Sequence, residues 1–491
     1  MKKIQILLLC IICSLPIYSQ EFTLDIGGQN ITYSVISKRN KTCAVIKGNQ
    51  VSGSLKLPET VQYDGEDYII TEIGTSAFFN CTKISSIVIS SQVTTIKSKA
   101  FAYCSGAVSL TLGESVTTIE SAAFAECSSL RYIYLDDNIL YIGDKAFLTC
   151  NKLESISIPS SVKSIGDDAF NYCWSLKRVD ISSLDAWCNI NFVSSTSNPL
   201  NYAGNLYLDN QKIEDLVVPN NIDAIGSYAF AGAKCITSIT FGNPAMTIGK
   251  GAFNKCTGLQ KIYISDMKSW CRYIFTNYES NPLQFAKHLI VNGEEVHDIT
   301  IPNCITKIEN FAFYKWSELR SVKMSNSIVS IGQEAFSCCT GLQSIEIPNS
   351  VKEISYNVFQ GCSNLRNVEI GSSVQSIESG VFSDCWLEEV TVNSIIPPYI
   401  SYSTFTTGAY MDVTLKVPIE AVDLYKNNSI WGKFEYIEGF ISDECPSGIE
   451  DLEADRDAMV EYYNLQGVKI TNPTPGVYIK RQGSKITKVV L

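Results

Sequence analysis

Histidine is almost missing from this 491-residue sequence, which contains only His288 and His297. Two histidines so close together cannot supply a distributed catalytic triad, and the glycine-rich nucleotide loop, the GxSxG elbow and the HExxH motif are absent. Basic residues, 39 in number, are outnumbered by 50 acidic ones, which disfavours nucleic acid as a partner. The sequence therefore predicts no enzyme, no metal site and no cofactor.

Long hydrophobic runs are also lacking. The longest begins at Ile4, ends at Ile12 and follows two lysines, and it is too short to span a bilayer. A charged start, a short apolar stretch and a small residue at Ser19 are typical of a secretory signal peptide, expected at residues 1–19. A lipoprotein cut before Cys13 is the alternative. We expect an exported protein with no transmembrane span in the mature chain.

What the sequence does contain is a repeat of 23 residues, seen at 158–180 as IPSSVKSIGDDAFNYCWSLKRVD. Its mark is a Phe, usually preceded by Ala and followed three residues later by Cys. Successive copies of this Phe are 23 residues apart within each of three groups, and 60 residues separate one group from the next. A fixed period in this range is typical of a solenoid. The repeated residues, called ladder phenylalanines below, are Phe78, Phe101, Phe124, Phe147, Phe170, Phe230, Phe253, Phe313, Phe336, Phe359 and Phe382.

Each repeat is predicted to form one coil of strand, turn, strand and helical turn. The alternating Leu176-x-x-Val179-x-Ile181 suits a short strand with one buried face, and residues 162–166 suit a second extended piece. Apolar residues at every third position around Phe170 predict a 3₁₀ or short helical turn. Because one coil cannot bury its own apolar face, the core must form between coils stacked about 4.7–4.9 Å apart.

Half of the 18 cysteines lie three residues after a ladder phenylalanine. Disulfides are the usual expectation for an exported protein, but identical neighbours in a ladder would strain such a bond. We predict buried free thiols, one per coil, with cross-coil disulfides as the alternative. These ladder cysteines are Cys81, Cys104, Cys127, Cys150, Cys173, Cys256, Cys339, Cys362 and Cys385.

Two insertions of 37 residues, at about 182–218 and 265–301, are copies of one another, because Trp187-Cys188 and Asn198-Pro199-Leu200 both recur 83 residues later. Each predicts a short helical piece around Trp-Cys, a loop and a hairpin, with Asn292-Gly293 as the turn in the second copy. We expect the tryptophans to pack in the core, with exposed binding aromatics as the alternative, and the loops to project from one side.

The ends of the chain differ from the repeats. Residues 20–72 alternate as strands do and are expected to form an N-terminal β-rich cap on the solenoid, which covers 73–395. Strand signals and a short helix at 396–441 predict a C-terminal cap. The acidic stretch 442–459 predicts a linker, and 460–491 a strand-rich tail.

The pattern IPxSVxxIGxxAFxxCxxLxxI resembles the leucine-rich repeats of BspA-like bacterial surface proteins over roughly residues 70–395. This resemblance implies a curved, right-handed stack of coils that attaches to host or bacterial partners. The tail, with Tyr462-Tyr463-Asn464-Leu465-Gln466-Gly467, resembles the C-terminal sorting domains of the type IX secretion system. That second resemblance implies export to the cell surface or medium, or a periplasmic location where the machinery is missing.

An outward column of side chains is expected on the first strand of each coil, where tyrosine and arginine would suit protein contact. Solvated strand residues without a ligand are the alternative. We expect a non-enzymatic surface or secreted adhesion protein that binds proteins or glycoproteins of the host matrix or other bacteria; the alternative is a structural scaffold of the cell envelope. The candidate face comprises Tyr132, Tyr134, Lys177, Arg178, Lys261, Tyr263, Arg320, Lys323 and Arg366.

Overall fold

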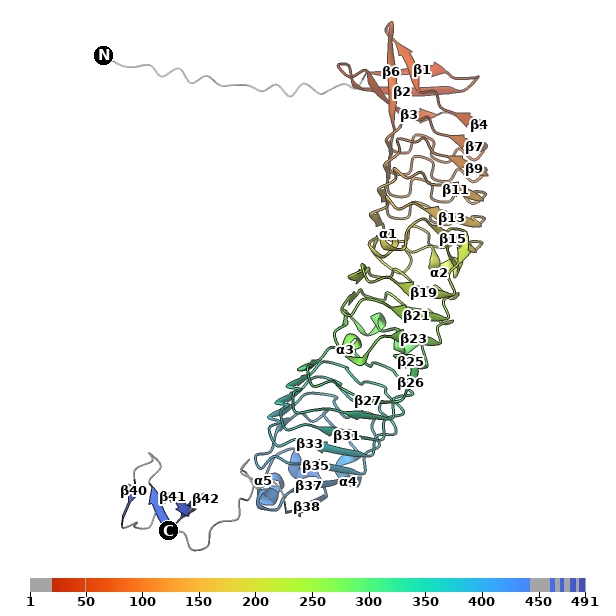
Figure 1. Ribbon diagram of the computed structural model, residues 1–491. Helices are drawn as coiled ribbons and strands as arrows, with labels where there is room; N and C mark the ends of the chain where they lie inside the picture. Colours follow the sequence, from red (N-terminus) through yellow and green to blue (C-terminus); the bar gives the residue numbers. More distant parts are fainter. Residues whose placement is uncertain are drawn as a thin grey trace, which may run out of the picture. The chain divides into compact units, whose positions relative to one another are not determined.

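The computed structural model describes residues 20–48, 50–441, 460–463, 469–471, 477–482 and 485–490. The expected signal peptide and acidic linker lie outside the described residues. Contacts divide the chain into two compact units, Met1–Glu438 and Gly439–Leu491. The first unit is a β-solenoid of about 17 turns spaced about 23 residues apart, which confirms the predicted fold class (Figure 1). In the part of the chain that is described, no helix has the length and apolarity needed to cross a membrane.

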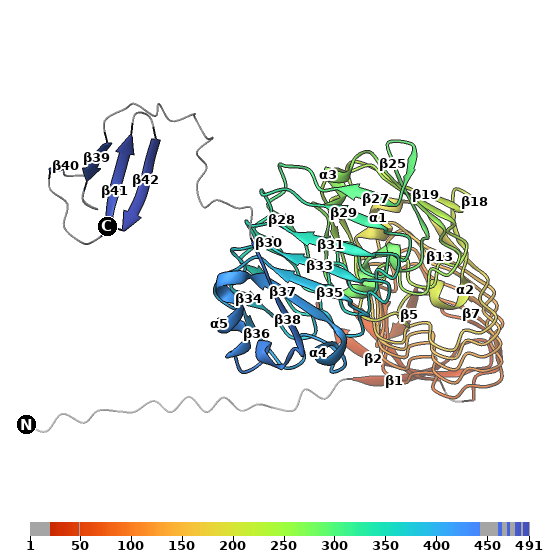
Figure 2. The same cartoon turned by 90° about the horizontal axis from the view of Figure 1, so that it is seen from below.

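Each coil contributes one longer strand to one parallel sheet and a two-residue strand to another, here called the long-strand and short-strand sheets. Figure 2 separates the two sets, with the sheet of β31 and β33 distinct from that of β28 and β30. Equivalent aliphatic residues are paired in register, as Ile133 is with Leu110 and Ile156. Because side chains alternate along a strand, this register directs one apolar column into the core.

The first group of coils builds two continuous sheets. The N-terminal strands extend the short-strand sheet and cover its edge, since β6 pairs in parallel with both β3 and β8. The N-terminal strands are β1 (Glu21–Asp25), β2 (Asn30–Ser37), β3 (Thr42–Gly48), β5 (Thr60–Tyr63) and β6 (Glu66–Ile73), followed by the short strands β8 (Thr95–Ile96), β10 (Thr118–Ile119), β12 (Tyr141–Ile142), β14 (Ser164–Ile165) and β16 (Asn191–Phe192). The long strands are β4 (Gly53–Lys56), β7 (Ile84–Val88), β9 (Ser109–Thr111), β11 (Tyr132–Tyr134), β13 (Ser155–Ile158), β15 (Arg178–Ile181) and β17 (Leu206–Leu208), with the antiparallel β18 (Gln211–Lys212) at the edge.

Two further groups follow, each beginning new sheets. The second has long strands β19 (Asp215–Val218), β21 (Ser238–Phe241), β23 (Lys261–Ile264) and β25 (His288–Val291), the antiparallel β26 (Glu294–Val296), and short strands β20 (Ala224–Ile225), β22 (Thr247–Ile248) and β24 (Ile274–Phe275). The third has β27 (Asp298–Thr300) paired with β29 (Ser321–Lys323), then a sheet of β31 (Ser344–Ile347), β33 (Asn367–Ile370), β35 (Glu389–Val392), β37 (Thr414–Pro418) and β38 (Tyr436–Phe440). Its short strands are β28 (Lys307–Ile308), β30 (Ser330–Ile331), β32 (Glu353–Ile354), β34 (Ser376–Ile377) and β36 (Tyr399–Ile400).

The segment around each ladder phenylalanine is a chain of tight turns with 3₁₀-type hydrogen bonds. In the coil of Phe170, the amide of Asn171 donates to Asp168 O and that of Cys173 to Phe170 O, each spanning three residues. Asp168 and Tyr172 adopt left-handed backbone conformations, with φ of 54° and 63°. Left-handed residues interrupt a right-handed helix, so the predicted three-residue spacing is present without a continuous helical turn.

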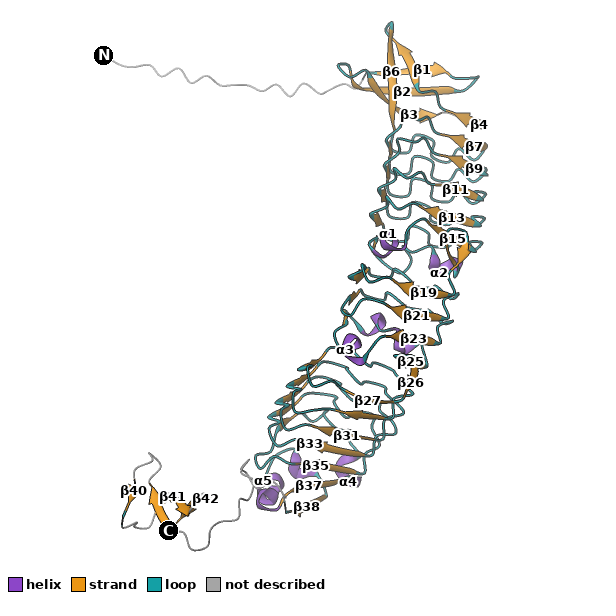
Figure 3. Ribbon diagram, in the orientation of Figure 1, coloured by secondary structure: helices purple, strands orange, loops and turns teal. Residues whose placement is uncertain are grey.

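Short helices gather at the insertions and near the C-terminal end of the first unit (Figure 3). The hairpin predicted at Asn292-Gly293 is confirmed, since β25 and β26 pair antiparallel and both turn residues have positive φ. The expectation of projecting loops was wrong, because Asn198 and Leu200 are fully buried. The helices are α1 (Leu184–Cys188), α2 (Leu200–Ala203), α3 (Met267–Trp270), η1 (Tyr278–Ser280), η2 (Pro282–Gln284), α4 (Ala409–Asp412), η3 (Ile419–Ala421), α5 (Val422–Lys426) and η4 (Trp431–Lys433).

The second unit contains a four-stranded antiparallel sheet in the order β40-β39-β41-β42. Its strands are β39 (Val460–Tyr463), β40 (Lys469–Ile470), β41 (Val477–Gln482) and β42 (Lys485–Val490).

Candidate functional site

Stacked phenylalanine rings join neighbouring coils inside the solenoid. From Phe78 to Phe170 five ring centroids follow one another at separations of 5.0, 5.3, 5.5 and 5.4 Å, with planes within 11° of parallel. A second stack joins Phe230 to Phe253, and a third runs from Phe313 to Phe405, one ring beyond the predicted ladder. All these rings are buried. Such a core makes the sheet above it a rigid platform.

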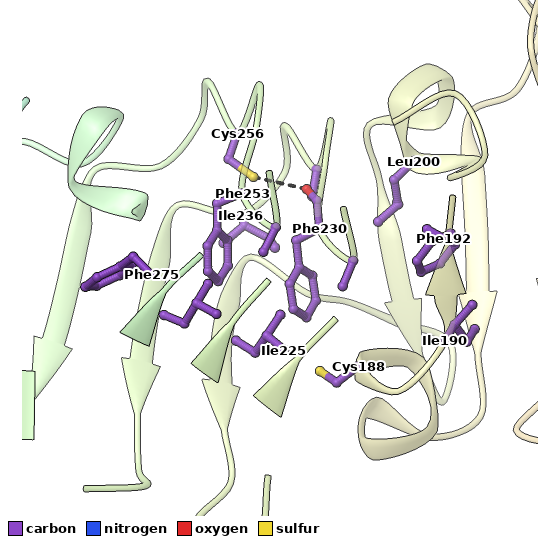
Figure 4. Packing of buried hydrophobic residues seen from close by; sticks show 14 of the residues in the cluster. Cys188, Ile190, Phe192, Leu200, Ile225, Phe230, Ile236, Phe253, Cys256 and Phe275 are labelled. Carbon is purple, nitrogen blue, oxygen red and sulfur yellow. Dashed lines mark hydrogen bonds between the residues drawn. The ribbon is translucent and has the colours of Figure 1, made fainter. Parts of the chain in front are cut away.

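The ladder cysteines connect the coils through their thiols. Cys150 Sγ donates to the carbonyl oxygen of Phe124 at 3.4 Å, and Cys256 Sγ to Phe230 O at 3.1 Å, as the dashed line in Figure 4 shows. The same contact, with the Phe of the preceding coil, is made by Cys104, Cys127, Cys173, Cys339, Cys362 and Cys385, whereas the half-buried Cys81 donates to Gly48 O. Burial raises the pKa of Cys104 and Cys173 to about 12, which makes these thiols poor nucleophiles.

In the two coils that directly follow the insertions, the cysteine is replaced by another residue. Ala233 and Trp316 occupy the cysteine position in the two coils that follow the insertions. In a regular coil the alanine before each Phe receives the Phe amide of the preceding coil, as Ala169 O does from Phe147 N at 2.8 Å. After an insertion that donor must come from elsewhere.

Buried side chains of the insertion supply the missing donors. Trp187 Nε1 donates to Ala229 O at 2.8 Å, and Asn198 Nδ2 donates to Tyr228 O and Ala229 O at 2.8 and 2.9 Å. Asn198 Oδ1 accepts from the amide of Leu200 at 2.9 Å. The predicted burial of the insertion tryptophans is confirmed, and the polar contacts explain why tryptophan and asparagine occur there.

The second insertion repeats this arrangement. Trp270 Nε1 and Asn281 Nδ2 both donate to Ala312 O at 2.9 Å, and Asn281 Nδ2 also donates to Phe311 O at 2.7 Å. We call each set of contacts a junction.

The exposed face of the first long-strand sheet carries the tyrosines of the predicted binding face. Tyr132 lies between Ser109 and Ser155 of the adjacent strands, and its side chain is 56% exposed. Tyr134 lies between Thr111 and Ser157 and is 74% exposed. We call these two residues the tyrosine ridge, because each large ring stands between small side chains.

A charged cluster lies on β15, two strands from the ridge in the same sheet. Arg178 donates from Nε to Asp180 at 2.7 Å and from Nη2 to Asn210 at 2.9 Å, and its guanidinium lies 4.0 Å from the ring centroid of Tyr207. Lys177 precedes this strand and is exposed. Sequence reasoning missed Tyr207 and Asn210, although the apolar-Tyr-apolar alternation of Leu206-Tyr207-Leu208 is a usable strand signal.

The remaining predicted face residues do not join the ridge in one sheet. Lys261 and Tyr263 lie on β23, and Lys323 lies on β29, in sheets separated from the first by the insertion hairpins. Arg320 is exposed before β29. Arg366 precedes β33, and its Nη1 donates to backbone carbonyls, including those of Ser363 and Leu365, so it is committed to a turn. The predicted face is therefore divided among four separate sheets.

Both histidines of the chain lie beside the carboxylate of Glu295. His288 Nδ1 is 2.6 Å and His297 Nε2 is 3.4 Å from Glu295 Oε1. The hydrogen bond from His288 lowers the pKa of Glu295. In the residues that the structure describes, no group of three or more His, Cys, Asp or Glu side chains is arranged to hold a metal ion.

Comparison with known proteins identifies the repeat. A family model described as the BspA type leucine rich repeat region matches residues 71–198, 201–291 and 284–409, more than half of the chain. Solved structures with similar folds include a leucine-rich repeat protein of Bacteroides ovatus (24% identity, 75% of this chain and 94% of that one, TM-score 0.41). Another similar structure is a leucine rich cell surface protein of Faecalibacterium prausnitzii (21% identity, 86% of this chain and 96% of that one, TM-score 0.30). A third is the pneumococcal vaccine antigen PcpA (20% identity, 86% of this chain and 99% of that one, TM-score 0.37). No curated protein matches the chain. The chain is a member of the BspA-type leucine-rich repeat family.

Proposed function

We propose that this chain is a non-enzymatic surface or secreted adhesion protein that binds protein or glycoprotein partners through its long-strand sheet. The observation that carries the proposal is the tyrosine ridge. Tyr132 and Tyr134 are widely exposed on a rigid parallel sheet, and small residues on either side leave room for a partner's side chains. Tyrosine is enriched in binding hot spots because it buries a large area and retains a polar tip.

The hydroxyl groups and the neighbouring charges add specificity. Tyr132 Oη donates to Glu154 at 3.4 Å, in an exposed contact beside the ridge. Tyr134 Oη has no hydrogen-bond partner among the described residues and is available to a ligand. The Arg178 cluster lies two strands away and is held by Asp180 and Tyr207. A preorganised face of this kind loses little side-chain entropy on binding.

Replacing both ridge tyrosines with alanine is expected to weaken partner binding at least about 30-fold, because two central aromatic contacts of about 1–2 kcal/mol each would be lost. The purified chain is incubated with immobilised matrix proteins and with whole bacterial cells, and bound protein is measured against concentration. Saturable binding that the double variant loses supports adhesion. Capture of only self-derived envelope components would instead support an envelope scaffold.

Tyr141→Ala is the matched control, because Tyr141 is 50% exposed but lies on the short strand β12. It removes an exposed tyrosine of the solenoid without touching the long-strand face. Equal loss of binding in this variant and in the double variant would contradict a specific role for the ridge.

We also propose that the tail directs the protein to the cell surface or medium through a type IX sorting route. The support is its strand-rich sequence and the separate antiparallel sheet of β39 to β42. The tail belongs to a different compact unit from the repeats, so a transport machine could engage it while the repeats stay folded.

Deleting residues 460–491 is expected to leave a folded solenoid in the periplasm while the full-length protein reaches the surface or medium. Protease shaving of intact cells, followed by fractionation, measures the location in a bacterium that has the secretion machinery. The truncated protein should keep the melting behaviour of the full chain, which excludes misfolding as the cause. Equal surface exposure of both forms would contradict the sorting role.

A further inference from the structure

A pocket of about 540 Å³ lies at the last coil, between the turn around Trp386 and helix α4. The turn is one residue short. Cys173 and Leu176 are three residues apart, whereas Cys385 and Leu387 are two apart, and β35 pairs with β33 at a step of 22 residues, as Asn367 does with Glu389. Its lining includes Arg366, Asp384, Trp386, Leu387, Glu388, Asp412 and Val413.

Trp386 is one of the residues that line this pocket. It is 72% exposed, although it follows a ladder cysteine. Trp174 has the same place in its coil and is 68% exposed, but there Tyr172 and Tyr202 pack around it at 5.7 and 5.3 Å. Trp386 has no ring contact with another aromatic side chain among the described residues, and three carboxylate residues share its pocket. The two tryptophans therefore differ in their surroundings, because aromatic rings pack on Trp174 and a pocket lies beside Trp386.

Asp384, Glu388 and Asp412 line the same pocket as Trp386. Glu388 Oε1 lies 3.5 Å from Arg366 Nε, and the same guanidinium donates from Nη1 to Trp386 O at 3.1 Å. The carboxylates of Asp384 and Asp412 have no hydrogen bond or ion pair within the described chain. Three carboxylates thus line the pocket together with one guanidinium, that of Arg366, which already donates hydrogen bonds to backbone carbonyls.

We infer that this pocket binds an arginine side chain from a basic segment of a partner protein. A guanidinium can stack on the exposed indole and donate to Asp384 and Asp412 at its edge. The buried Leu387 and Val413 provide an apolar wall for the aliphatic part of the side chain. A neutral group of the same shape would leave the two carboxylates uncompensated. This site is independent of the tyrosine ridge and does not rest on the adhesion proposal.

The test uses the full-length chain labelled with 5-fluorotryptophan, whose six tryptophan resonances are assigned by single Trp→Phe substitutions. The probe is Nα-acetyl-arginine methylamide at about 0.15 M salt, and the matched control probe is the citrulline analogue, which is neutral and nearly isosteric. The arginine probe should shift the Trp386 resonance with a Kd of order millimolar, as a single side chain allows. The citrulline probe should shift it little, and Trp174 serves as an internal control that should not respond.

The charge requirement is tested by Asp384→Asn and Asp412→Asn. Each should weaken the arginine probe about threefold, and the double variant about tenfold, without changing the melting temperature. Equal shifts from the arginine and citrulline probes, equal responses of Trp174 and Trp386, or undiminished binding to the double variant would each overturn the inference.

Discussion

Replacing Phe124 with alanine is expected to cost about 3–5 kcal/mol of local stability, as for other fully buried phenylalanines. Phe124 is fully buried, and its ring lies between those of Phe101 and Phe147, at centroid distances of 5.3 and 5.5 Å. The substitution removes two ring contacts and leaves a cavity that rigid neighbouring coils cannot close. Each coil contacts only its neighbours, so the loss should appear near residue 124 before more distant coils open.

Hydrogen exchange resolved by peptide, together with limited proteolysis, measures this local opening. Phe124→Leu is the matched control, because it keeps most of the apolar volume and loses only the stacking, so its cost should be near 1 kcal/mol. Phe79→Ala removes an exposed ring and should change little. Unchanged exchange and no new cleavage near residue 124 in the alanine variant would show that the ring stack does not stabilise the coils.

The repeat could be predicted because its signals are local and recur in phase. A Phe at every 23rd residue must occupy the same place in each coil, and alternating aliphatics on each side define the strands. The structure shows the Phe rings stacked and the strands paired in register at that step. The thiol donation to the previous coil could not be predicted, because its acceptor is a backbone carbonyl 26 residues away.

The insertions show where sequence reasoning stops. Their duplication, helices and second hairpin turn could be predicted from spacing and from Asn292-Gly293. The burial of Asn198 could not, because an Asn-Pro pair ordinarily indicates an exposed turn. Its partners, Tyr228 O and Ala229 O, lie 30 and 31 residues away. Only the tertiary structure explains why a polar loop residue belongs in the core.

Among the candidate binding residues, too, the direction of some side chains could be predicted from the sequence and that of others could not. Alternation correctly directs Tyr132 and Tyr134 outward, because every second residue of a strand faces solvent. Arg366 lies outside any strand, so alternation does not fix its direction, and the structure turns it toward backbone carbonyls. The missing residue before Leu387 is visible in the sequence, but the pocket that results depends on helix α4 lying opposite.

The junctions themselves should be among the most sensitive points of the chain, and Asn281→Ala is expected to cost about 3–5 kcal/mol there. Asn281 is fully buried and forms three hydrogen bonds, donating to Phe311 O and Ala312 O and accepting from Leu283 N at 2.9 Å. The two carbonyls each keep one other donor, but the buried Leu283 amide would lose its acceptor. Loss of three hydrogen bonds at about 1 kcal/mol each, with one amide left unsatisfied, gives the expected size.

Hydrogen exchange across residues 260–320 measures the effect, which should separate the coils before the junction from those after it. The matched control is Asn364→Ala. Asn364 Nδ2 also donates to a backbone carbonyl of the previous coil, Thr340 O at 2.8 Å, but Asn364 is exposed, so the substitution should cost less than about 1 kcal/mol.

Asn281→Asp gives an independent test, in which the pH dependence of stability is measured. Its new carboxylate would lie beside two carbonyl oxygens, so its pKa should rise above the unfolded value of about 3.9. Folding would then take up a proton, and this variant should gain stability as the pH falls from 7 toward 4. A flat pH dependence relative to the unmodified chain, or equal costs for Asn281→Ala and Asn364→Ala, would contradict the role assigned to the buried amide.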